Sequence, residues 1–254
     1  MTKVAEKRPA RPAKAKKASK AEVRPWAAAL VLAAGAGKRL GAGGRKGLLS
    51  LGGRPLYAWS VEAFLNAPFV GQVMVVVHGE DLRSVGAACQ RRFRDPRLKV
   101  VAGGAERQDS VRFGLQSMDP HMEVILVHDA ARPFINASLI KNCAVTARLL
   151  GGAVASVPVK DSIKLEEKNG MLKALPREQL RAAQTPQAYQ AVLLREAHAQ
   201  ALLKHRYYTD EAGLCEAAGT PSVAVPSYYE NFKITTPEDL PLAKRIIGSF
   251  DFRG

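Results

Sequence analysis

The chain has 254 residues, 47% of them hydrophobic, so it can bury one sizeable core and is too short for two large domains. Its formal net charge is +15, and nine Lys or Arg against two Glu fall in residues 1–25, which leaves 29 basic and 21 acidic residues elsewhere. No window approaches ~18 apolar residues and no secretory signal opens the chain, so we expect a protein without membrane spans. The net positive charge of residues 26–254 is compatible with binding of an anionic ligand.

The cysteines argue against a disulfide framework or a zinc site. Cys89, Cys143 and Cys215 are far apart and form no C-x-x-C or C-x-H pair. Three unpaired thiols are typical of a reducing compartment, so we expect a cytoplasmic protein.

Residues 1–25 consist mainly of Lys, Ala, Pro and Arg, with too few large apolar side chains to repay the entropy of ordering. We expect a disordered, solubilising tail. An organellar presequence is disfavoured, because such segments are usually Ser-rich and amphipathic and this one has a single Ser. Residues 26–250 are expected to form one folded domain.

Short apolar runs then alternate with segments of helical periodicity. The predicted strand and helix pairs are 27–33 with 55–67, 72–77 with 81–93, 98–101 with 108–118, and 123–127 with 136–150. Continuous apolar strands separated by helices indicate an α/β fold, doubly wound, with a mostly parallel sheet and helices on both faces. Ligands of such sheets bind at the carboxyl ends of the strands, so the loops after Ala33, Val77, Val101 and Val127 are the candidate site.

Residues 159–187 break this rhythm with charged residues, an Asn169–Gly170 hairpin signal, Pro176 and Pro186. We interpret them as a projecting β-arm. After the arm the pattern predicts helices over 190–204 and 210–218, short strands over 222–225 and 231–235, and a last helix opened by Thr236, Pro237 and Glu238.

The first candidate site is the glycine-rich loop that runs from Ala33 to Gly41. Its glycines allow backbone N–H groups to approach phosphate, and Arg39 and Lys46 supply positive charge. The spacing matches neither the G-x-x-x-x-G-K-[ST] loop nor the dinucleotide loop, whose third glycine is replaced by Leu40. A purely structural turn explains such a loop about as often, but the two cations favour a nucleotide.

Two more strand ends carry polar groups. Gly103, Gly104 and Ser110 offer backbone and hydroxyl groups for a pyrimidine edge, although on its own this segment is better explained as a tight turn with Asp109 or Ser110 capping a helix. Asp129 directly follows a buried strand, where Mg²⁺ is often held between a carboxylate and phosphates, and it could equally cap the next turn. His128 is interpreted as structural.

The remaining polar groups are scattered, and singly each is typical of a solvated face or a cap. Lys233 is of interest because a lysine aimed into a site acts as a point charge for phosphate. The others are Asp161, Ser162 and Arg177 on the arm, the segments 184–187 and 209–211, and Glu230 with its neighbours.

Read together, the motifs H-D-A-A-R-P, T-P-Q, T-D-E-A and N-x-K-I-T, in this order after the two glycine-rich loops, resemble the 2-C-methyl-D-erythritol 4-phosphate cytidylyltransferase family over about residues 27–247. The resemblance implies a Rossmann-like nucleotidyltransferase domain over 26–250. It implies Mg²⁺-dependent, in-line attack of the polyol phosphate on the α-phosphorus of CTP. The products would be 4-diphosphocytidyl-2-C-methyl-D-erythritol and pyrophosphate, in non-mevalonate isoprenoid precursor synthesis. It also implies a homodimer whose arms reach the partner's site.

The same resemblance assigns roles to individual residues. Arg39 and Lys46 would stabilise charge on the α-phosphoryl group, assisted by Lys233. The nucleotide would be bound by Ala33, Ala34, Gly35, Gly37, Gly103, Gly104, Arg107 and Ser110, with cytosine at Gly103, Gly104 and Ser110. Asp129 would hold the metal beside the substrates. The methylerythritol phosphate would be bound by Arg132, Ser162, Arg177, Thr185 and Thr209, of which Arg177 and Thr185 would come from the partner's arm.

The sequence departs from the family pattern at Arg45 and Gly47, where Pro and Gln are common. Two alternatives stay open. A sister cytidylyltransferase for another pentitol phosphate, such as ribitol 5-phosphate, shares the nucleotide half of the pattern, and only the arm distinguishes it. A basic nucleic-acid-binding protein is suggested by the sequence pI near 10.0, but the aromatic content is 6% and no aromatic stripe is present.

Overall fold

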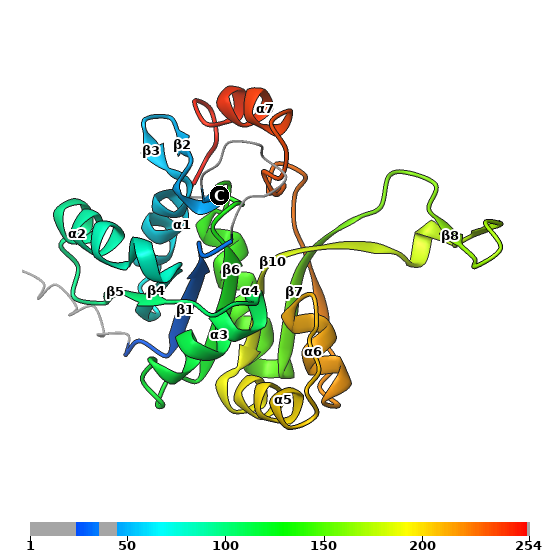
Figure 1. Ribbon diagram of the computed structural model, residues 1–254, viewed down its shortest axis with the longest axis horizontal. Helices are drawn as coiled ribbons and strands as arrows, with labels where there is room; N and C mark the ends of the chain where they lie inside the picture. The colour runs from blue at the N-terminus through cyan, green and yellow to red at the C-terminus, as the bar shows by residue number, and fades with distance from the viewer. Residues whose placement is uncertain (1–23, 36–44, 253–254) are drawn as a thin grey trace, which may run out of the picture.

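The computed structural model describes residues 24–35 and 45–252 (Figure 1). Its central sheet has seven strands in the order β11-β7-β10-β6-β1-β4-β5, and β10 alone runs antiparallel to its neighbours. The mostly parallel sheet predicted from the sequence is confirmed. The strands are β1 (Ala27–Leu32), β4 (Val70–Val77), β5 (Leu98–Ala102), β6 (Val124–Asp129), β7 (Gly152–Pro158), β10 (Arg181–Gln190) and β11 (Val223–Pro226).

Alternate residues of β1 face two separate cores, which is why the strand is apolar throughout. Ala27, Ala29 and Val31 pack with α1, α2 and α4 on one face, whereas Ala28 and Leu30 pack with α3, α5 and α6 on the other. Helices therefore cover both faces, as predicted. They are α1 (Leu56–Leu65), α2 (Leu82–Phe93), α3 (Arg107–Gln116), α4 (Ala137–Leu150), α5 (Ala191–Leu203) and α6 (Glu211–Ala217).

The register of the parallel strands brings their carboxyl ends together. Leu32 at the end of β1 pairs with Val76 of β4 on one side and with Asp129 of β6 on the other. The loop after β1 therefore begins beside Asp129. In Figure 1 these strand ends point toward α7 (Asp239–Ile246), at the top of the view.

A third, smaller core holds the C-terminal region over these strand ends. Leu51, Leu56, Phe134, Ile234 and Ala243 are buried together there. They join α7 to the hairpin of β2 (Ser50–Leu51) and β3 (Arg54–Pro55). The predicted strand over residues 231–235 is wrong. The segment buries Ile234, whose N–H donates to the Ala131 carbonyl (2.9 Å), but it belongs to no sheet.

The structure also corrects the region around the expected arm. β7 was not predicted, and β10 enters the central sheet between β6 and β7, so that residues 184–187 are buried rather than on the arm. What projects from the body is the hairpin of β8 (Lys164–Glu166) and β9 (Leu172–Ala174), followed by the short helix η4 (Arg177–Gln179) (Figure 1). Residues 1–23 lie outside the described residues. Within the described ranges, no helix is long and apolar enough to cross a membrane.

Candidate active site

A pocket of about 400 Å³ lies at the carboxyl ends of β1, β4 and β6. Its walls come from Ala33, Ala34 and Gly35 after β1, Lys46 and Gly47, His78 after β4, residues 104–107 and Ser110 around the start of α3, Asp129 of β6, and Lys233. A larger groove of about 940 Å³ runs between α2 and β5, but it has an open shape and no glycine-rich turn. We take the smaller pocket as the site because it gathers glycine turns and convergent charges.

Lys46 is brought to the pocket by the short helix η2 (Lys46–Leu48), which lies close against the loop after β1. At Gly47, a Cβ atom would lie 2.7 Å from the Ala33 Cβ, so the close approach requires glycine. Arg45 ties the same helix to the start of α2 through ion pairs with Glu80 and Asp81. The two departures from the family pattern thus hold Lys46 in place.

The turn at Gly103 and Gly104 is closed by Ser110. The Ser110 hydroxyl accepts a hydrogen bond from the Gly104 N–H (3.1 Å) and donates one to the Glu106 carbonyl (3.2 Å). At Gly104, a Cβ atom would lie 2.4 Å from the Asp109 Cβ, so any other residue would push the turn away from α3. The N-cap of α3 is Glu106, and Asp109 completes the capping box by accepting from the Glu106 N–H (3.4 Å), whereas Ser110 is not a cap. Ser110 therefore shapes the pocket wall that the sequence assigned to cytosine.

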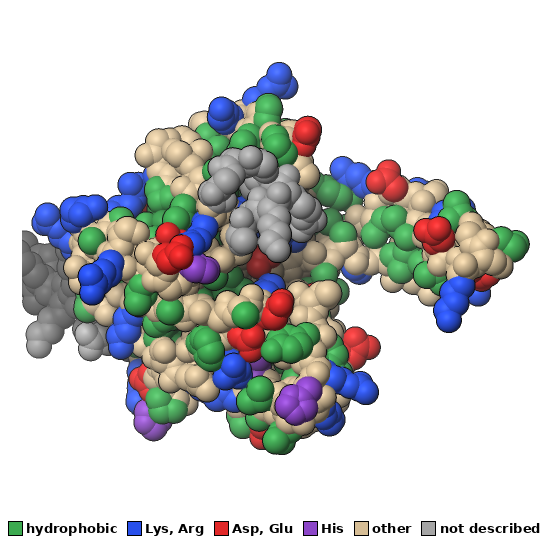
Figure 2. All heavy atoms as spheres, viewed as in Figure 1, with side chains coloured by type: hydrophobic (Ala, Val, Ile, Leu, Met, Phe, Trp, Pro, Cys, Tyr) green, Lys and Arg blue, Asp and Glu red, His purple; other side chains and the backbone are tan. Residues whose placement is uncertain are grey.

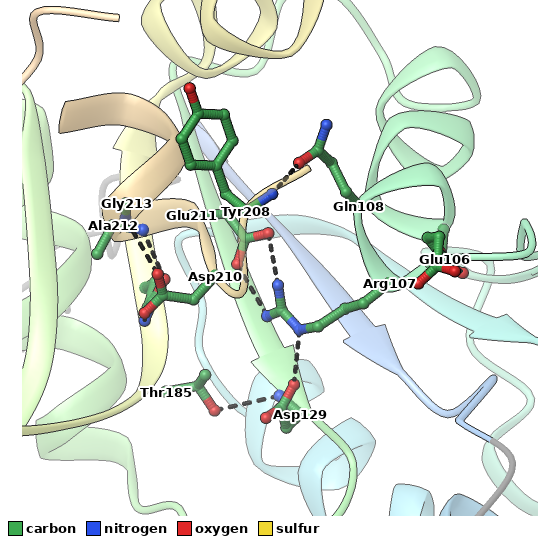
Figure 3. Close-up of polar contacts among 12 residues, drawn as sticks. Glu106, Arg107, Gln108, Asp129, Thr185, Tyr208, Asp210, Glu211, Ala212 and Gly213 are labelled. Carbon is green, nitrogen blue, oxygen red and sulfur yellow. Dashed lines mark hydrogen bonds and ion pairs between the residues drawn. The ribbon is translucent and has the colours of Figure 1, made fainter. Parts of the chain in front are cut away.

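Four side chains of alternating charge, Lys233, Asp129, Arg107 and Glu211, lie in a row at the site, and Figure 3 shows the last three. Lys233 Nζ lies 2.6 Å from Asp129 Oδ2, Arg107 Nε lies 3.4 Å from Asp129 Oδ1, and the Arg107 Nη atoms each lie 2.8 Å from a Glu211 oxygen. Burial alone would raise the pKa of Asp129, but the charges of Arg107 and Lys233 outweigh it and hold this pKa below its ordinary value. Asp129 is therefore a carboxylate at neutral pH.

Buried polar groups beneath Asp129 fix its position. The Thr185 hydroxyl accepts a hydrogen bond from the Asp129 N–H (3.1 Å) and lies 3.0 Å from His128 Nδ1, while His128 Nε2 lies 3.0 Å from the Arg132 carbonyl oxygen. Burial lowers the pKa of His128 to about 4, which keeps this side chain neutral. The structure thus corrects one expectation, because Thr185 lies within the chain's own sheet, 3% exposed, and not on an arm that reaches a partner.

Arg132 is half-buried beside this group and connects it to the C-terminal segment. Its Nη1 donates to the Asn231 carbonyl (2.8 Å), and the Asn231 side chain donates in turn to Gln184 Oε1 (3.0 Å) and to the Thr185 carbonyl (2.9 Å). These bonds hold the segment that carries Lys233 against β10. Asn231 received no role from the sequence.

Comparison with known proteins decides the family. The family model described as 2-C-methyl-D-erythritol 4-phosphate cytidylyltransferase matches residues 27–249. The chain belongs to this family. It is 38% identical over 224 residues to the enzyme of that name from Halalkalibacterium halodurans (88% of this chain, 98% of the relative), and 42% identical over 222 residues to that from Shouchella clausii (87% and 96%). The crystal structure of the Thermus thermophilus enzyme of this name matches with a TM-score of 0.69 and 32% identity, covering 86% of this chain and 98% of that one.

Several residues that the family resemblance singled out lie away from the pocket. Ser162 and Arg177 are exposed on the arm, where Arg177 Nη1 donates to the Lys160 carbonyl (3.0 Å). Thr209 is exposed just before α6. Gly37 and Arg39 lie outside the described residues.

The pocket offers one carboxylate to a divalent cation. In the described part of the chain, no three His, Cys, Asp or Glu side chains are grouped as a complete metal site. Mg²⁺ usually binds one or two carboxylates together with substrate phosphates, so the ionised Asp129 carboxylate at the pocket wall fits as a single protein ligand.

Sequence reasoning named Glu211 within the T-D-E-A motif but gave it no role. Nothing local indicates that this acid would meet Arg107, which is 104 residues away along the chain. A helix start just after an exposed turn predicts a solvated cap, whereas Glu211 is 1% exposed.

Proposed function

We propose that this chain transfers CMP from CTP to 2-C-methyl-D-erythritol 4-phosphate, forming 4-diphosphocytidyl-2-C-methyl-D-erythritol and pyrophosphate in non-mevalonate isoprenoid precursor synthesis. The observation that carries the proposal is one pocket lined by Lys46, by two glycine-rich turns and by the ionised Asp129 with its partners Arg107 and Lys233. Phosphoryl-type transfer needs positioning and positive charge more than it needs a base, and this pocket offers both. Family membership supports the same two substrates.

The nucleotide binds along the turns of the pocket. The loop of Ala33, Ala34 and Gly35, continued by Gly37, presents backbone N–H groups to the triphosphate, and the turn of Gly103 and Gly104 receives the cytosine. Lys46 and Arg39 stabilise the charge that builds on the α-phosphoryl oxygens as the acceptor phosphate attacks. Lys233, which also lines the pocket, adds positive charge beside Asp129.

Asp129 would hold a divalent cation, Mg²⁺ by preference, through its carboxylate. Such an ion would supply positive charge to the phosphates of CTP. Thr185 supports this site indirectly, since its hydroxyl fixes the Asp129 backbone. The chain's own task is to keep Asp129 ionised and oriented.

The methylerythritol phosphate is bound next to Asp129, by Arg132 with Thr209 and by Ser162 and Arg177 of an arm. Because that arm extends away from its own body, we propose a homodimer in which each arm serves the partner's pocket. The arm carries exposed apolar side chains, Ile163, Leu165, Met171 and Leu172, that a partner surface would cover (Figure 2).

Mixing two variants that are each nearly inactive at a polyol phosphate concentration well below the KM of Arg177→Ala tests this arrangement. Arg177→Ala removes an arm residue and Lys233→Met removes a pocket residue. If the arm acts on the partner's site, randomly mixed dimers contain one intact site in half of the molecules, and about a quarter of wild-type activity returns. If the arm acts on its own chain, no intact site forms and the mixture stays inactive.

The three cysteines of the chain are free, buried thiols, which supports a role in the reducing cytoplasm.

The reaction itself is tested by pyrophosphate release from CTP and Mg²⁺, with methylerythritol phosphate, ribitol 5-phosphate or no acceptor in parallel. We expect release with methylerythritol phosphate alone. Release with ribitol 5-phosphate only would keep the mechanism and change the substrate. If a folded protein that binds CTP released no pyrophosphate with any acceptor, the proposal would be contradicted.

A further inference from the structure

The pocket wall at Arg107 depends on a buried acid that does not reach the pocket. Glu211, the first residue of α6, is 1% exposed and is absent from the pocket lining, whereas Arg107 and Asp129 both line it. In Figure 3 the Glu211 carboxylate lies on the far side of the Arg107 guanidinium from Asp129. Both carboxylate oxygens accept a hydrogen bond at 2.8 Å, one from each Arg107 Nη. A paired fork of this kind fixes the plane of the guanidinium.

Glu211 is itself held firmly against the sheet. Asp210 caps α6 by accepting from the Gly213 N–H (3.0 Å), and the Gln187 side chain donates to Asp210 Oδ2 (2.8 Å) and accepts from the Ala212 N–H (3.0 Å). Gln187 belongs to β10, the strand that also carries Thr185 beneath Asp129. The acid therefore has little freedom to follow Arg107 if that side chain moves.

This pairing decides how Arg107 meets Asp129. With one N–H of each terminal nitrogen bonded to Glu211, Arg107 meets Asp129 through Nε alone, at the long distance of 3.4 Å. Without Glu211, the fork of Arg107 is free to turn and pair with the Asp129 carboxylate, since a guanidinium prefers two parallel bonds to one. Arg107 would then leave the pocket wall, and Asp129 would lose its capacity to hold a cation.

We propose that Glu211 is a positioning residue for CTP binding, which holds the Arg107 guanidinium at the pocket wall and keeps it from closing on Asp129. This inference rests on the proposed function, since it assumes that the pocket takes CTP. It differs from a role in stability alone, in which Glu211 merely ties α6 to α3. A stability role predicts that CTP affinity is insensitive to the charge of Glu211 in a folded protein.

The experiment measures the Kd of CTP by calorimetry for wild type, Glu211→Gln, Arg107→Met and the double variant. Glutamine keeps the volume of Glu211 and removes its charge. We expect Glu211→Gln to weaken CTP binding by roughly tenfold or more, the scale of a charge-assisted pair, with little change in KM for the polyol phosphate. We expect the double variant to bind CTP no more weakly than Arg107→Met, because Glu211 acts only through Arg107.

Cys215→Ala is the matched control on the same helix. Cys215 is fully buried in α6 and takes no part in the charged pair, so its truncation should lower Tm without changing CTP affinity. If Glu211→Gln does not fold, Glu211→Asp keeps the charge and withdraws the carboxylate, and a folded Glu211→Asp protein should still bind CTP several-fold more weakly than wild type.

Wild-type affinity in Glu211→Gln, or in folded Glu211→Asp where the glutamine variant fails, would overturn the inference. The inference would also be overturned if the losses of CTP affinity from Glu211→Gln and Arg107→Met multiplied in the double variant. Unchanged CTP affinity in Arg107→Met would overturn it as well. Failure of the proposed function is seen separately, because it would appear in the wild-type protein as absent CTP binding or absent pyrophosphate release.

Discussion

Replacing Lys233 by methionine tests the charge that the pocket supplies to the transition state. The Lys233 side chain is 37% exposed and its Nζ lies 2.6 Å from Asp129, and methionine keeps its length while it removes its charge. A unit charge about 4 Å from an ammonium gains roughly 4 kcal/mol at an effective dielectric constant of about 20. If about half a unit of charge develops on the phosphoryl oxygens, the difference between ground and transition state is about 2 kcal/mol, or ~30-fold in kcat.

Loss of the Lys233 ammonium also leaves the negative charge of the Asp129 carboxylate less compensated. That charge then repels the phosphates of CTP. We therefore expect Lys233→Met to lower kcat by about 30- to 100-fold in a pyrophosphate-release assay at saturating substrates. Lys204→Met, at an exposed position at the end of α5, is the matched control and should leave kcat unchanged. If a folded Lys233→Met protein has a kcat within about threefold of wild type, Lys233 does not stabilise the transition state by its charge, because that role predicts a loss of about 30-fold or more.

Further changes test other parts of the account. Lys46→Ala or Arg39→Ala should each lower kcat by ~10²-fold or more if the charge acts in the transition state, and near-normal turnover would exclude that role. Arg177→Ala should mainly raise KM for the polyol phosphate, and an equal rise for CTP would contradict the arm assignment. Chelation with EDTA should abolish turnover and added Mg²⁺ should restore it, whereas turnover in EDTA would exclude the metal.

Burial lowers the pKa of His198 from 6.5 to about 4, so the unfolded chain binds the proton first and stability falls as pH drops from about 6.5 to 4. His198→Leu should reduce the slope of the free energy of unfolding against pH, measured by denaturant unfolding, by at most about 1.4 kcal/mol per pH unit. His205→Gln, at an exposed position, is the control and should leave this slope unchanged. An unchanged slope in His198→Leu would contradict this.

Most of the sheet could be predicted because its strands are apolar on both faces. In β1, alternate residues enter two different cores, so the sequence shows a continuous apolar run where a one-sided strand would alternate. β7 escaped prediction because most of its residues are small, and Ser156 interrupts its short apolar run of Ala153, Val154 and Ala155. The segment 231–235 alternates like a strand but is buried by packing, with no neighbouring strand to pair with it.

The position of the site followed from a general rule, since parallel strands place their following loops at one edge. The partners within the site did not follow. Thr185 lies beneath Asp129 only because β10 inserts antiparallel between β6 and β7, and Glu211 meets Arg107 only because α6 packs on the same face as α3. Neither contact leaves a local signal in the sequence.

The fate of the α-phosphorus of CTP distinguishes transfer of CMP from hydrolysis. CTP labelled at this atom is incubated with the protein, Mg²⁺ and methylerythritol phosphate, and the products are separated. Transfer of CMP predicts that all of the released label appears in a cytidine diphosphate ester of the polyol, while the β- and γ-phosphates leave as pyrophosphate. Label in free CMP or CDP, or no dependence on the polyol, would contradict the account, because the pocket would then hydrolyse CTP instead of joining it to an acceptor.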